Sequence, residues 1–529
     1  MIAMTLAQVA AAIGVAAPTG AESVSVRSVE FDTRRIRPGA LFVALHGERV
    51  DGHDFAGTAA AAGAVAVLGS APIDAAIPLL RVADRPDNAG VLDALGDLAR
   101  ASVTALVRDH GLEVVGVTGS SGKTSTKDLI ATVLRTLVER PAMVIAPPES
   151  FNNELGHPYT ALQADESTRF LVLELSARGI GHVAALARVA PPRIGAVLNV
   201  GSAHIGEFGS VEAIAEAKSE LVQALPSASQ VPGRGGVAIL NADDPLVAAM
   251  AGRTRAQVVF VGEAPSATVR ATGVTVDDAG RARFTLITPE GSAPVALRVV
   301  GAHQVGNALT AAAVARAVGM STPALADALS RAEPVSRWRM DVTELANGVT
   351  LINDAYNANP HSTRAALQAL VVIGRGRRTW AVLGEMAELG DESIPAHDEI
   401  GRLVVRLGVD RLLVVAGPGA ATGTAVGGRT APRALHLGAH LEGSWGGESE
   451  LVADVDSAVE ALLDELVAGD VVLVKASRSM GLERVALRLI DAVGVADEVP
   501  AAGLPVGGVT SDGVRALGVF VDPAKAGGA

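Results

Sequence analysis

The amino-acid sequence predicts an α/β protein of three domains: a small N-terminal α/β unit, a central domain with a parallel sheet and a phosphate-binding loop, and a doubly wound C-terminal domain. Hydrophobic residues make up 49% of the chain but aromatic residues only 3%, so the apolar mass is mostly Ala, Val and Leu, which suits α/β layers. Short apolar runs alternate with segments of helical spacing along most of the chain. The length of 529 residues is too great for one hydrophobic core, so several domains are expected.

The first domain is predicted over residues 1–109. Residues 1–17 are apolar but carry no Lys or Arg ahead of the apolar part, and polar residues and a glycine interrupt them. This pattern favours an amphipathic helix over a signal peptide. A turn-rich segment, an Ala-rich helical stretch and a short strand over 64–68 complete a small α/β unit.

The second domain is predicted over residues 110–335. A strand over 112–117 enters a glycine-rich loop, and the spacing of apolar residues then predicts a helix over 123–138. A second helix is expected at 211–225, and further strands at 170–175, 194–200 and 237–240 continue a parallel-sheet pattern.

The third domain is predicted over residues 336–492 as a doubly wound, Rossmann-like unit. Its strands are expected at 350–354, 379–383, 411–415 and 471–475, with helices between them. Residues 493–529 are rich in Gly, Pro and Ala without periodicity and are expected to be a flexible tail.

The charge balance and residue usage narrow the class of protein. The formal net charge of -13 provides no basic field for nucleic acid, so a polyphosphate ligand must be held by local groups. The absence of cysteine and of a long apolar run favours a cytoplasmic protein that does not enter the membrane. Lysine is scarce and marks positions where an amine is needed: Lys123, Lys127, Lys218, Lys475 and Lys525.

The segment from Thr118 to Thr124 reads TGSSGKT and predicts a phosphate-binding loop. Its glycines let backbone N–H groups converge on phosphate oxygens at the start of a helix. Lys123 would reach the β- and γ-phosphates, and Thr124 would ligate Mg²⁺. Because Val117 replaces the first glycine of the strict motif, an ordinary strand–helix turn is the competing interpretation.

Three further side chains follow strands or lie on a helix of the same domain. Glu174 ends a strand, where an acidic group in a parallel sheet faces the ligand crevice, although a pair with Arg178 would explain it equally. His204 follows the next strand, and a histidine in a loop is more often structural. Lys218 lies on a helix, where a solvated lysine is the simplest interpretation. A carbamate formed there with CO₂ would be an anionic metal ligand.

Taken together, the motifs resemble the Mur ligases of peptidoglycan synthesis. The resemblance covers nearly the whole chain and rests on PGALFVALHGERVDGHDF, VTGSSGKTST, SFNNELGHP, LELSARGIG, NVGSAHIGEFGS, EAKSE, HQVGNA, INDAYNANP, GEMAELG and KASRSMGLE. The motifs YNANP, GEMAELG and the SRS triplet are similar to those of family members that add D-alanyl-D-alanine.

The resemblance implies the roles of individual residues. Catalytic roles fall on Lys123, Glu174, His204, Lys218 and Arg339, with Arg337 close enough to be confused with the last. The Mg²⁺ ligands would be Thr124, Glu174, His204 and carbamylated Lys218. The ATP-binding residues would be Thr118, Gly119, Ser120, Ser121, Gly122, Lys123, Thr124, Ser125, Asn307, Arg339 and Asp354.

The same resemblance implies substrate contacts in the other two domains. UDP-sugar contacts would come from Thr33, Arg34, Gly47, Asp51, Gly52 and His53, in a stretch that could equally be a turn-rich sheet. Other substrate contacts would come from Asn152, Asn153, Asn357, Asn359, Lys475, Ser477 and Arg478. The chain departs from many relatives at Asn353, Ser176 and Ala476, but Asp354 keeps the charge that the mechanism needs.

The activity implied is an ATP-dependent amide ligation. The γ-phosphoryl group of ATP passes to the carboxylate of a UDP-N-acetylmuramoyl tripeptide, and the amine of D-alanyl-D-alanine attacks the acyl phosphate. The products are ADP, phosphate and the cytoplasmic pentapeptide precursor of peptidoglycan. A monomer that closes its third domain over small-molecule substrates is expected.

Other functions remain open at this stage. Another ligase of the same superfamily would add a single amino acid to a UDP-muramoyl chain, or glutamate to folate. A P-loop ATPase that drives a partner protein would release phosphate without an amine or a UDP-sugar. A catalytically dead scaffold would have lost several site charges, and none is missing.

Overall fold

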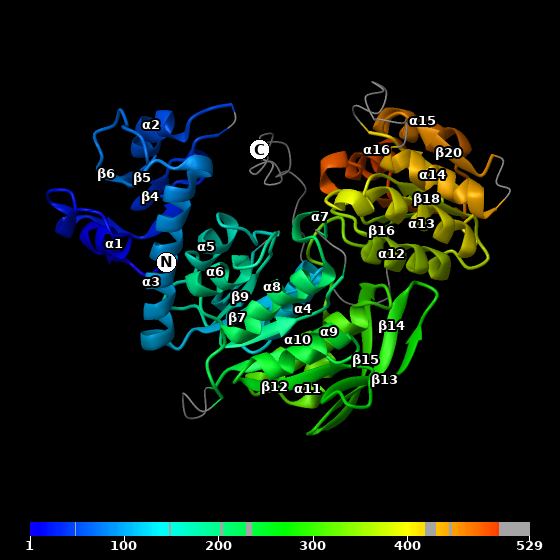
Figure 1. Ribbon diagram of the computed structural model, residues 1–529, viewed down its shortest axis with the longest axis horizontal. Coiled ribbons are helices and arrows are strands. Elements are labelled where there is room, and N and C mark those ends of the chain that lie inside the picture. Colours follow the sequence, from blue (N-terminus) through cyan, green and yellow to red (C-terminus); the bar gives the residue numbers. More distant parts are fainter. Residues whose placement is uncertain are drawn as a thin grey trace.

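The computed structural model describes residues 1–47, 49–147, 150–201, 205–228, 235–417, 430–443 and 447–496. These residues form three lobes (Figure 1), here called the N-terminal lobe (1–110), the central lobe (113–331) and the C-terminal lobe (341–496). In Figure 1 the N-terminal and C-terminal lobes stand on either side above the central one. In the described part of the chain, no helix combines the length and the apolarity that crossing a membrane requires.

The N-terminal lobe contains a four-stranded parallel sheet in the order β3-β4-β5-β6 and a two-stranded antiparallel pair, β1-β2. Its elements are β1 (Met4–Thr5), α1 (Leu6–Ala12), β2 (Ser25–Val26), β3 (Ser28–Glu30), β4 (Ala40–Val43), α2 (Ala56–Ala61), β5 (Ala64–Gly69), β6 (Leu79–Arg81) and the long helix α3 (Ala89–His110).

The first helix is shorter than the sequence pattern indicated. Helix α1 covers only Leu6 to Ala12, because Thr5 caps it in a capping box and Gly14 adopts a left-handed φ of 70° just after it. Met4 and Thr5 instead pair with the strand at 25–26. The expectation of one helix over 1–17 was therefore wrong in extent.

The central lobe is built on a nine-stranded sheet in the order β15-β14-β13-β12-β11-β10-β7-β9-β8. Its strands are β7 (Glu113–Thr118), β8 (Val144–Ile145), β9 (Phe170–Glu174), β10 (Ile194–Val197), β11 (Val237–Asn241), β12 (Gln257–Gly262), β13 (Val269–Val276), β14 (Arg281–Thr288) and β15 (Gly291–Val300). Its helices are α4 (Lys123–Arg135), α5 (Gly156–Ala161), α6 (His182–Val189), α7 (Ile205–Phe208), α8 (Val211–Gln223), α9 (Pro245–Ala248), α10 (Gln304–Ala317) and α11 (Thr322–Arg331).

The strands predicted in this lobe are present, with ends shifted by one to three residues. The sheet is not wholly parallel, however, because β13, β14 and β15 add an antiparallel extension that the sequence interpretation did not include. Alternate residues of β14 are buried, among them Ala282, Phe284 and Leu286. This alternation is the usual sign of a strand with one face on the core.

The C-terminal lobe has a six-stranded sheet in the order β16-β17-β21-β18-β19-β20, parallel except for β16. Its strands are β16 (Asp341–Glu344), β17 (Thr350–Asn353), β18 (Thr379–Leu383), β19 (Arg411–Val415), β20 (Ser449–Val452) and β21 (Val471–Lys475). Its helices are α12 (Pro360–Ile373), α13 (Ser393–Arg406), α14 (Ala431–Glu442), α15 (Val455–Glu465) and α16 (Glu483–Val493).

The segment predicted as a tail begins inside this lobe. Val493 ends α16, and the backbone N–H of Ala496 donates to the Glu344 carbonyl at 2.9 Å, so residues 494–496 still pair with the edge of the sheet. Residues 497–529, with Lys525, lie outside the described part of the chain.

The cores show how the lobes are joined. One buried cluster runs from Leu41 and Leu98 of the N-terminal lobe into Leu171 and Leu221 of the central lobe, so these two lobes share a hydrophobic interior. The opposite face of the central sheet has its own cluster around α4 and α10. The two faces of the C-terminal sheet are covered by two further clusters. The C-terminal lobe is thus packed largely within itself.

Candidate active site

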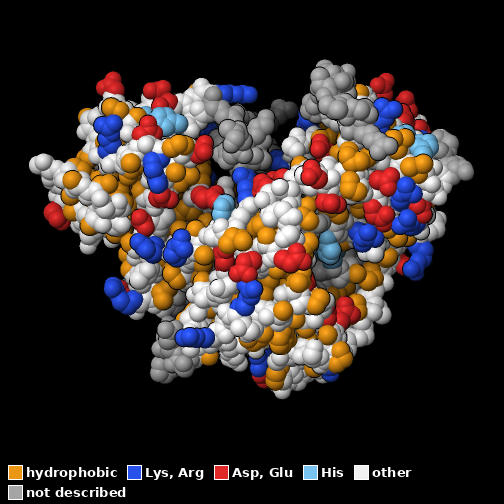
Figure 2. All heavy atoms as spheres, in the orientation of Figure 1, with side chains coloured by type: hydrophobic (Ala, Val, Ile, Leu, Met, Phe, Trp, Pro, Cys, Tyr) orange, Lys and Arg blue, Asp and Glu red, His pale blue; other side chains and the backbone are white. Residues whose placement is uncertain are grey.

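A cleft of about 470 Å³ lies between the central and C-terminal lobes. The central lobe contributes the loop after β7 and the ends of β9 and β12, and the C-terminal lobe contributes the loop after β17 and the start of α12. On the face of the molecule drawn in Figure 2, acidic and basic side chains are interspersed. The carboxyl ends of parallel strands from two sheets therefore meet across one crevice, where α/β proteins bind ligands.

The glycine-rich loop has the strand–loop–helix setting that the sequence predicted. Strand β7 ends at Thr118 and α4 begins at Lys123, with Gly122 at its N-cap in a left-handed conformation (φ 79°). A methyl group on Gly119 would lie 2.9 Å from Leu198 Cβ, and one on Gly122 would lie 2.8 Å from Asn307 Oδ1. Both positions therefore need glycine, and the N-terminus of α4 is directed into the cleft.

Neighbouring strands hold the loop in this shape. Thr118 is buried and its hydroxyl donates to the Leu175 carbonyl at 2.8 Å. The backbone N–H of Ser121 donates to Asn199 Oδ1 at 2.9 Å, and the Ser120 hydroxyl accepts from the Gly201 N–H at 2.8 Å. The loop is thus fixed to the ends of β9 and β10 by hydrogen bonds rather than by packing alone.

Lys123 curls back over the loop that precedes it. Its Nζ donates to the Gly119 carbonyl at 2.7 Å. Burial lowers the pKa of Lys123, an effect opposed by the charge of Glu174 and reinforced by that of Arg339. Among the described residues, the ammonium group donates to this carbonyl, a partner that an incoming phosphate could replace.

Thr124 stands at the centre of the polar groups in the cleft. Its Oγ1 donates to Glu174 Oε2 at 3.2 Å and lies 2.8 Å from the Ser150 hydroxyl. Arg339, from the loop before β16, donates through Nη2 to Thr124 Oγ1 at 2.8 Å and to Ser150 at 2.9 Å. The Arg339 guanidinium also lies 4.1 Å from the centre of the Tyr356 ring. An arginine near the C-terminal lobe therefore touches the phosphate-loop helix directly.

The carboxylate of Glu174 is fully buried, and its Oε1 has no hydrogen-bond partner among the described residues. Among the described residues, the Glu174 carboxylate contacts Thr124 and Asn152, and no ion pair with Arg178 is present. A buried carboxylate oxygen without a donor costs free energy, and a hard cation would satisfy it. With the Thr124 hydroxyl 3.2 Å from the other oxygen, the donor set fits Mg²⁺.

Lys218 is buried on α8 rather than solvated, with 4% of its surface exposed. Burial, with a smaller contribution from Lys123, lowers the pKa of Lys218 to about 7. Its amine is therefore substantially neutral near neutral pH, which is the form that reacts with CO₂. Two other lysines, Lys127 and Lys475, are also enclosed, at 1% and 2% exposed. His204 lies outside the described residues.

On the nucleotide side, Asn307 is buried near the start of α10. Its amide donates to Gln304 at 2.8 Å and accepts from the Thr126 hydroxyl at 3.0 Å, so α10 is tied to α4. Ser125, Asn307 and Asp354 all line the cleft. Asn152 and Asn153 line it as well, and the Asn152 amide reaches Glu174 Oε2 at 3.4 Å.

The C-terminal wall of the cleft contains a buried ion pair. Lys475, at the end of β21, donates to Asp354 Oδ2 at 2.6 Å and to the Asn357 carbonyl at 2.8 Å. Asn359 caps α12, and Arg478 lies 4.6 Å from the Trp338 ring centre and 2.8 Å from Glu483. Ser477 does not line the cleft but accepts from the Ala387 N–H at 2.7 Å.

The three departures from the family pattern are accommodated locally. Asn353 is buried and accepts from the Ala355 N–H at 3.2 Å. Ser176 lines the cleft and donates to the Asn152 carbonyl at 2.8 Å. Ala476 is fully buried, with its methyl group directed at Gly384, where a Cβ would come within 2.8 Å of it. The methyl group at 476 therefore faces a glycine rather than open cleft.

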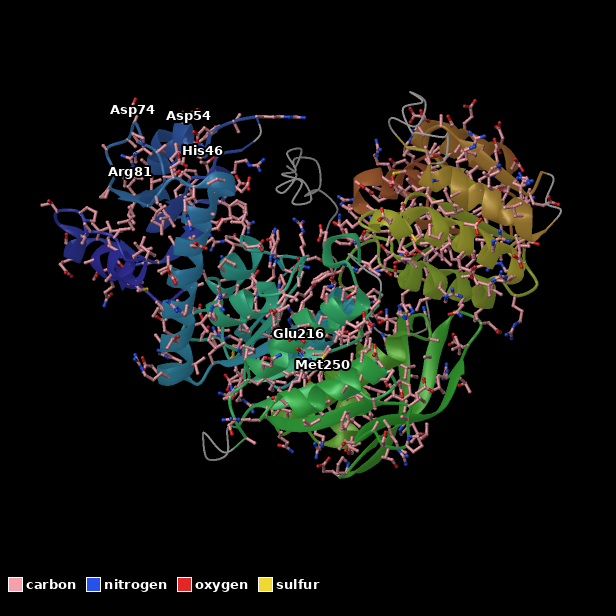
Figure 3. The ribbon with its side chains drawn as sticks, viewed as in Figure 1. His46, Asp54, Asp74, Arg81, Glu216 and Met250 are labelled. Atoms are coloured by element: carbon pink, nitrogen blue, oxygen red, sulfur yellow. The ribbon has the colours of Figure 1, made fainter. Side chains whose placement is uncertain are left out.

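The six candidate UDP-sugar residues lie in the N-terminal lobe, outside the cleft described above. Arg34 is exposed and pairs with Asp32 at 2.7 Å, while Thr33 begins the short 3-10 turn that Asp32 caps. Gly47 and Gly52 approach other backbone closely: a Cβ would lie 2.9 Å from the Val50 carbonyl and 2.7 Å from Leu45, respectively. In Figure 3, His46 lies in this lobe, well apart from Glu216 on α8.

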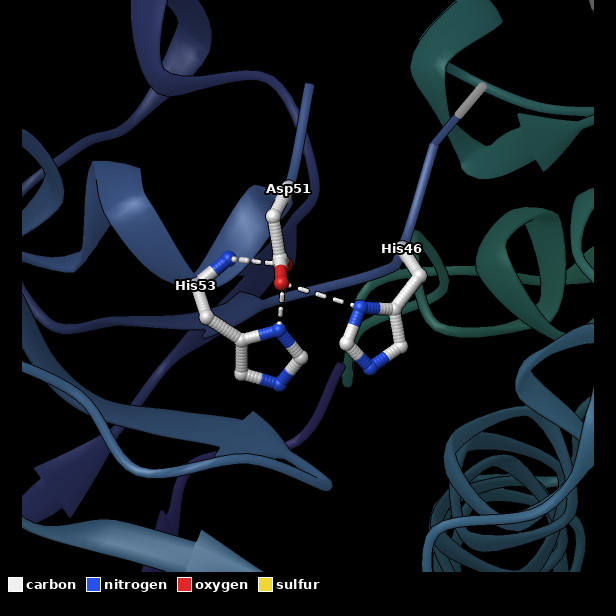
Figure 4. A group of neighbouring side chains, drawn as sticks. All are labelled: His46, Asp51 and His53. Atoms are coloured by element: carbon white, nitrogen blue, oxygen red, sulfur yellow. Dashed lines mark hydrogen bonds and ion pairs between the residues drawn. The ribbon is translucent and has the colours of Figure 1, made fainter. Parts of the chain in front are cut away.

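Asp51 connects two histidines in this segment (Figure 4). Its carboxylate lies 2.6 Å from His53 Nδ1 and 2.9 Å from His46 Nδ1. The backbone N–H groups of Ser70 and Ala71 both donate to His53 Nε2, at 3.0 and 3.2 Å. The His53 proton therefore belongs on Nδ1, facing Asp51. With both ring nitrogens hydrogen-bonded, the imidazole links Asp51 to the backbone at Ser70 and Ala71.

Most residues of the phosphate loop line the cleft, together with Glu174, Asn307, Arg339, Asp354 and Lys475. The structure also adds polar residues that the sequence interpretation missed: Ser150, His303, Tyr356, His361 and Glu388. Of these, His361 lies at the start of α12 with its Nδ1 3.3 Å from the Ser121 hydroxyl, a second contact between the lobes. Tyr356 and Glu388 lie inside the motifs YNANP and GEMAELG, which were the available signals.

Comparison with known proteins gives one consistent result. Three family models match successive parts of the chain: "Mur ligase family, catalytic domain" over 25–102, "Mur ligase middle domain" over 117–315 and "Mur ligase, glutamate ligase domain" over 338–478. Together they cover parts of all three lobes.

Among curated relatives, proteins named UDP-N-acetylmuramoyl-tripeptide--D-alanyl-D-alanine ligase are similar over three quarters or more of this chain. The one from Mycobacterium tuberculosis strain H37Rv is 50% identical, over 93% of this chain and 98% of its own. The one from Escherichia coli K12 is 37% identical, over 76% of this chain and 84% of its own.

Solved structures agree with these relatives. A crystal structure of MurF from Acinetobacter baumannii matches with a TM-score of 0.76 at 29% identity, over 92% of this chain and 99% of that one. MurF ligase from Thermotoga maritima in complex with ADP matches with a TM-score of 0.71 at 27% identity, over 88% of this chain and 97% of that one.

Proposed function

Because this chain belongs to the Mur ligase family, we infer that it joins D-alanyl-D-alanine to a UDP-N-acetylmuramoyl tripeptide at the expense of ATP. It is an ATP-dependent ligase of peptidoglycan synthesis. The residue assignments rest on the contact of Arg339 with Thr124. Through it, a cationic group from the C-terminal side lies against the phosphate loop.

The phosphate loop accounts for the nucleotide. Gly119 and Gly122 leave the backbone open to phosphate oxygens, and the N-terminus of α4 adds its positive dipole. Lys123 exchanges its bond to the Gly119 carbonyl for the transferring phosphoryl group. Asn307 serves the adenine side, and Asp354 contacts the nucleotide from the opposite lobe. Residues 118–125 thus form the fixed half of the site.

Mg²⁺ is the proposed cofactor, held by Thr124, Glu174, His204 and the carbamate of Lys218. The buried, unpartnered Oε1 of Glu174 supports a cation at this point. When bound, Mg²⁺ offsets the negative charge that accumulates on the phosphates. The pKa of about 7 for Lys218 supports the carbamate, because a neutral amine is the species that adds CO₂.

Arg339 and Lys123 then stabilise charge during the phosphoryl transfer. The tripeptide carboxylate attacks the γ-phosphorus, ADP leaves, and the resulting acyl phosphate is attacked by the amine of the dipeptide with release of phosphate. Lys123 and Arg339 approach the transferring group from opposite lobes, so both act only when the cleft is closed. No covalent bond to the protein is needed.

The remaining assignments concern the two other substrates. The UDP-sugar is proposed to bind the N-terminal lobe through Thr33, Arg34, Gly47, Asp51, Gly52 and His53, with His53 acting by holding Asp51. The dipeptide is proposed to bind near Asn357, Asn359, Lys475, Ser477 and Arg478, with Asn152 and Asn153 on the central side. The absence of cysteine supports a cytoplasmic enzyme, and we propose that it acts as a monomer.

The decisive experiment is phosphate release from ATP with a UDP-muramoyl tripeptide, in the presence and absence of D-alanyl-D-alanine. Full turnover should require both substrates, and the pentapeptide product should be found by mass spectrometry. Phosphate release that needs neither substrate would instead indicate an ATPase. Turnover with a single amino acid in place of the dipeptide would indicate a different ligase of the family.

A further inference from the structure

Arg339 lies between two residues with left-handed backbones. Trp338 has φ 59° and Met340 has φ 54°. Residues other than glycine rarely adopt this conformation, and they persist in it where their surroundings enforce it. From this bend the Arg339 guanidinium donates to Thr124 and Ser150 of the central lobe. The contacts that hold Trp338 and Met340 therefore fix the direction from which Arg339 approaches the phosphate loop.

Met340, the residue after Arg339, is held through Asp354. The Met340 N–H donates to Asp354 Oδ1 at 3.0 Å, and the Met340 side chain is buried in a core cluster of the C-terminal lobe. The other oxygen of the same carboxylate, Oδ2, accepts from Lys475 Nζ at 2.6 Å. The Asp354 carboxylate thus links the backbone next to Arg339 to the ammonium group of Lys475.

The ammonium group of Lys475 is enclosed and donates to several groups of the protein. Besides Asp354 Oδ2, it lies 3.4 Å from the Asp354 carbonyl oxygen and 2.8 Å from the Asn357 carbonyl oxygen. Only 2% of the Lys475 side chain is exposed. An ammonium group has three N–H donors, so these three acceptors can use all of them. A substrate that bound the Lys475 ammonium directly would have to displace one of these contacts.

Trp338, the residue before Arg339, is held from the same strand end. The Arg478 guanidinium lies 4.6 Å from the centre of the Trp338 ring, an arrangement in which the cation and the ring attract each other. The Trp338 carbonyl accepts from the Tyr356 N–H at 3.2 Å. The other neighbour of Arg339 is therefore tied to Arg478, three positions after Lys475.

Both neighbours of Arg339 are thus held by one short segment, residues 475–478, at the end of β21. Strand β21 lies inside the C-terminal sheet and pairs with β17 on one side and β18 on the other. The Asp354 N–H also donates to the Val474 carbonyl at 2.9 Å, so the loop after β17 is fixed to the same strand. The position of Arg339 therefore depends on an interior strand of the C-terminal sheet.

We propose that Lys475 and Arg478 are positioning residues for phosphoryl transfer, because they direct the Arg339 guanidinium at the phosphate loop. Lys475 acts through Met340, and Arg478 acts through Trp338. The proposal rests on the ligase function given above. It adds that a segment beside the proposed dipeptide site acts on the first chemical step, before the amine attacks.

The first experiment separates phosphoryl transfer from dipeptide binding. Lys475→Met keeps the length of the side chain but removes its charge. ADP formation in the first turnover, followed by rapid quench with all three substrates saturating, should slow by about 10- to 100-fold, the scale expected when a catalytic group is slightly misplaced. KM for D-alanyl-D-alanine should stay within about twofold of the wild-type value. A lysine that binds the dipeptide would give the reverse, a raised KM with an intact first turnover.

The second experiment asks whether the effect passes through Arg339. In an Arg339→Ala background, Lys475→Met should slow first-turnover ADP formation by less than about a further twofold, because the group that it positions is gone. The loss caused by a residue that serves only stability would instead multiply with the loss caused by Arg339→Ala. The pair of variants therefore distinguishes positioning from general support of the fold.

A third comparison tests the Trp338 side and does not depend on the folding of Lys475→Met. Trp338→Phe keeps a ring for Arg478 and should retain most of the first-turnover rate. Trp338→Leu removes the ring and should slow the first turnover by about 10-fold or more. The matched control is Arg337→Leu, which changes the exposed neighbour on the same bend and should leave the rate unchanged.

The proposal fails if Lys475→Met raises KM for the dipeptide while the first turnover is unchanged, since the lysine would then bind the dipeptide. It also fails if the losses from Lys475→Met and Arg339→Ala multiply, or if Trp338→Leu keeps the wild-type rate. A wild-type chain that cleaves ATP without the UDP-muramoyl tripeptide, or that forms no pentapeptide, would overturn the proposed function itself. The two failures are therefore distinguishable.

Discussion

Arg339 donates from Nη2 to Oγ1 of Thr124 at 2.8 Å, so a residue next to the C-terminal sheet is bonded to the first turn of the phosphate-loop helix. The two residues are 215 positions apart in sequence. The contact joins the central and C-terminal lobes directly across the cleft, and this arrangement is called closed below. It also identifies which of two neighbouring arginines reaches the site, since Arg337 is exposed.

Arg339→Lys is expected to reduce ligase turnover by at least about 100-fold without unfolding the protein. Lysine keeps the charge but loses the planar group that bonds both Thr124 and Ser150 while stacking on Tyr356. Steady-state kinetics and thermal melting measure the two effects. Arg337→Lys is the control and should behave as wild type; equal losses in both variants would show that the contact has no special role.

Gly206→Ala should prevent the lobes from reaching the closed arrangement. Gly206 lies in α7 with an ordinary φ, so alanine causes no backbone strain there, but its methyl group would meet Gly390. We expect kcat to fall at unchanged melting temperature, and small-angle scattering with substrates to show a more open molecule. Gly252→Ala, where the added methyl group meets nothing within 4 Å, is the control. Wild-type kinetics for Gly206→Ala would mean that catalysis does not require this contact.

Lys218→Ala should lose nearly all ligase activity, and bicarbonate or a small carboxylic acid should partly restore it. A carboxylate entering the space left by the side chain would replace the carbamate oxygen. Lys127→Ala is the comparison, because Lys127 donates to the Pro147 carbonyl at 2.7 Å. Any activity that this variant loses should not be restored by carboxylic acids. Full activity of Lys218→Ala without an additive would remove the carbamate from the mechanism.

The pH dependence of the carbamate follows from the lowered pKa of Lys218. With a pKa of about 7, roughly half of the amine is neutral at pH 7, whereas an unperturbed lysine would be almost fully protonated. Carbamate formation should therefore decline as the pH falls below about 7. Carbon NMR with labelled bicarbonate would follow it directly, with Lys218→Ala as the blank. A signal that persists unchanged at pH 5 would contradict this.

Glu30→Gln should stabilise the protein at pH 7 but not at pH 4. Burial raises the pKa of Glu30, although the Tyr159 hydroxyl, which donates to it at 3.1 and 3.2 Å, opposes this. A raised pKa means that the folded state favours the protonated acid, so ionisation above the unfolded pKa costs stability. Removing the Glu30 charge therefore increases the free energy of unfolding at neutral pH, where the carboxylate is ionised, but not at pH 4. Melting temperatures of both proteins at the two pH values test this, and an equal difference at both would contradict it.

The sequence was sufficient for the features that depend on local pattern. The phosphate loop followed from glycines placed between an apolar strand and a helix, and the buried strands at 379–383, 411–415 and 471–475 were located residue for residue. The antiparallel strands at 269–300 were not predicted, because the alternating pattern seen in β14 differs from the continuous apolar runs typical of buried parallel strands.

The missed site residues share a different cause. Ser150, His361 and Glu388 come to the phosphate loop only because distant segments fold together, and no spacing in the sequence encodes that approach. Glu388 lies in the GEMAELG motif, but its left-handed backbone conformation cannot be predicted from the residue type. Local chemistry was predictable, whereas the closing of one lobe on another was not.

The single interior that joins Leu41 and Leu98 to Leu171 and Leu221 has a consequence for protein engineering. A chimera made by exchanging the first 110 residues with those of a relative would cut through packed side chains and would need both halves redesigned. The C-terminal unit packs within its own two clusters, so a graft made near residue 335 disturbs little interior. The C-terminal lobe, which is proposed to bind the dipeptide, is therefore the natural part to exchange when a ligase of altered amine preference is sought.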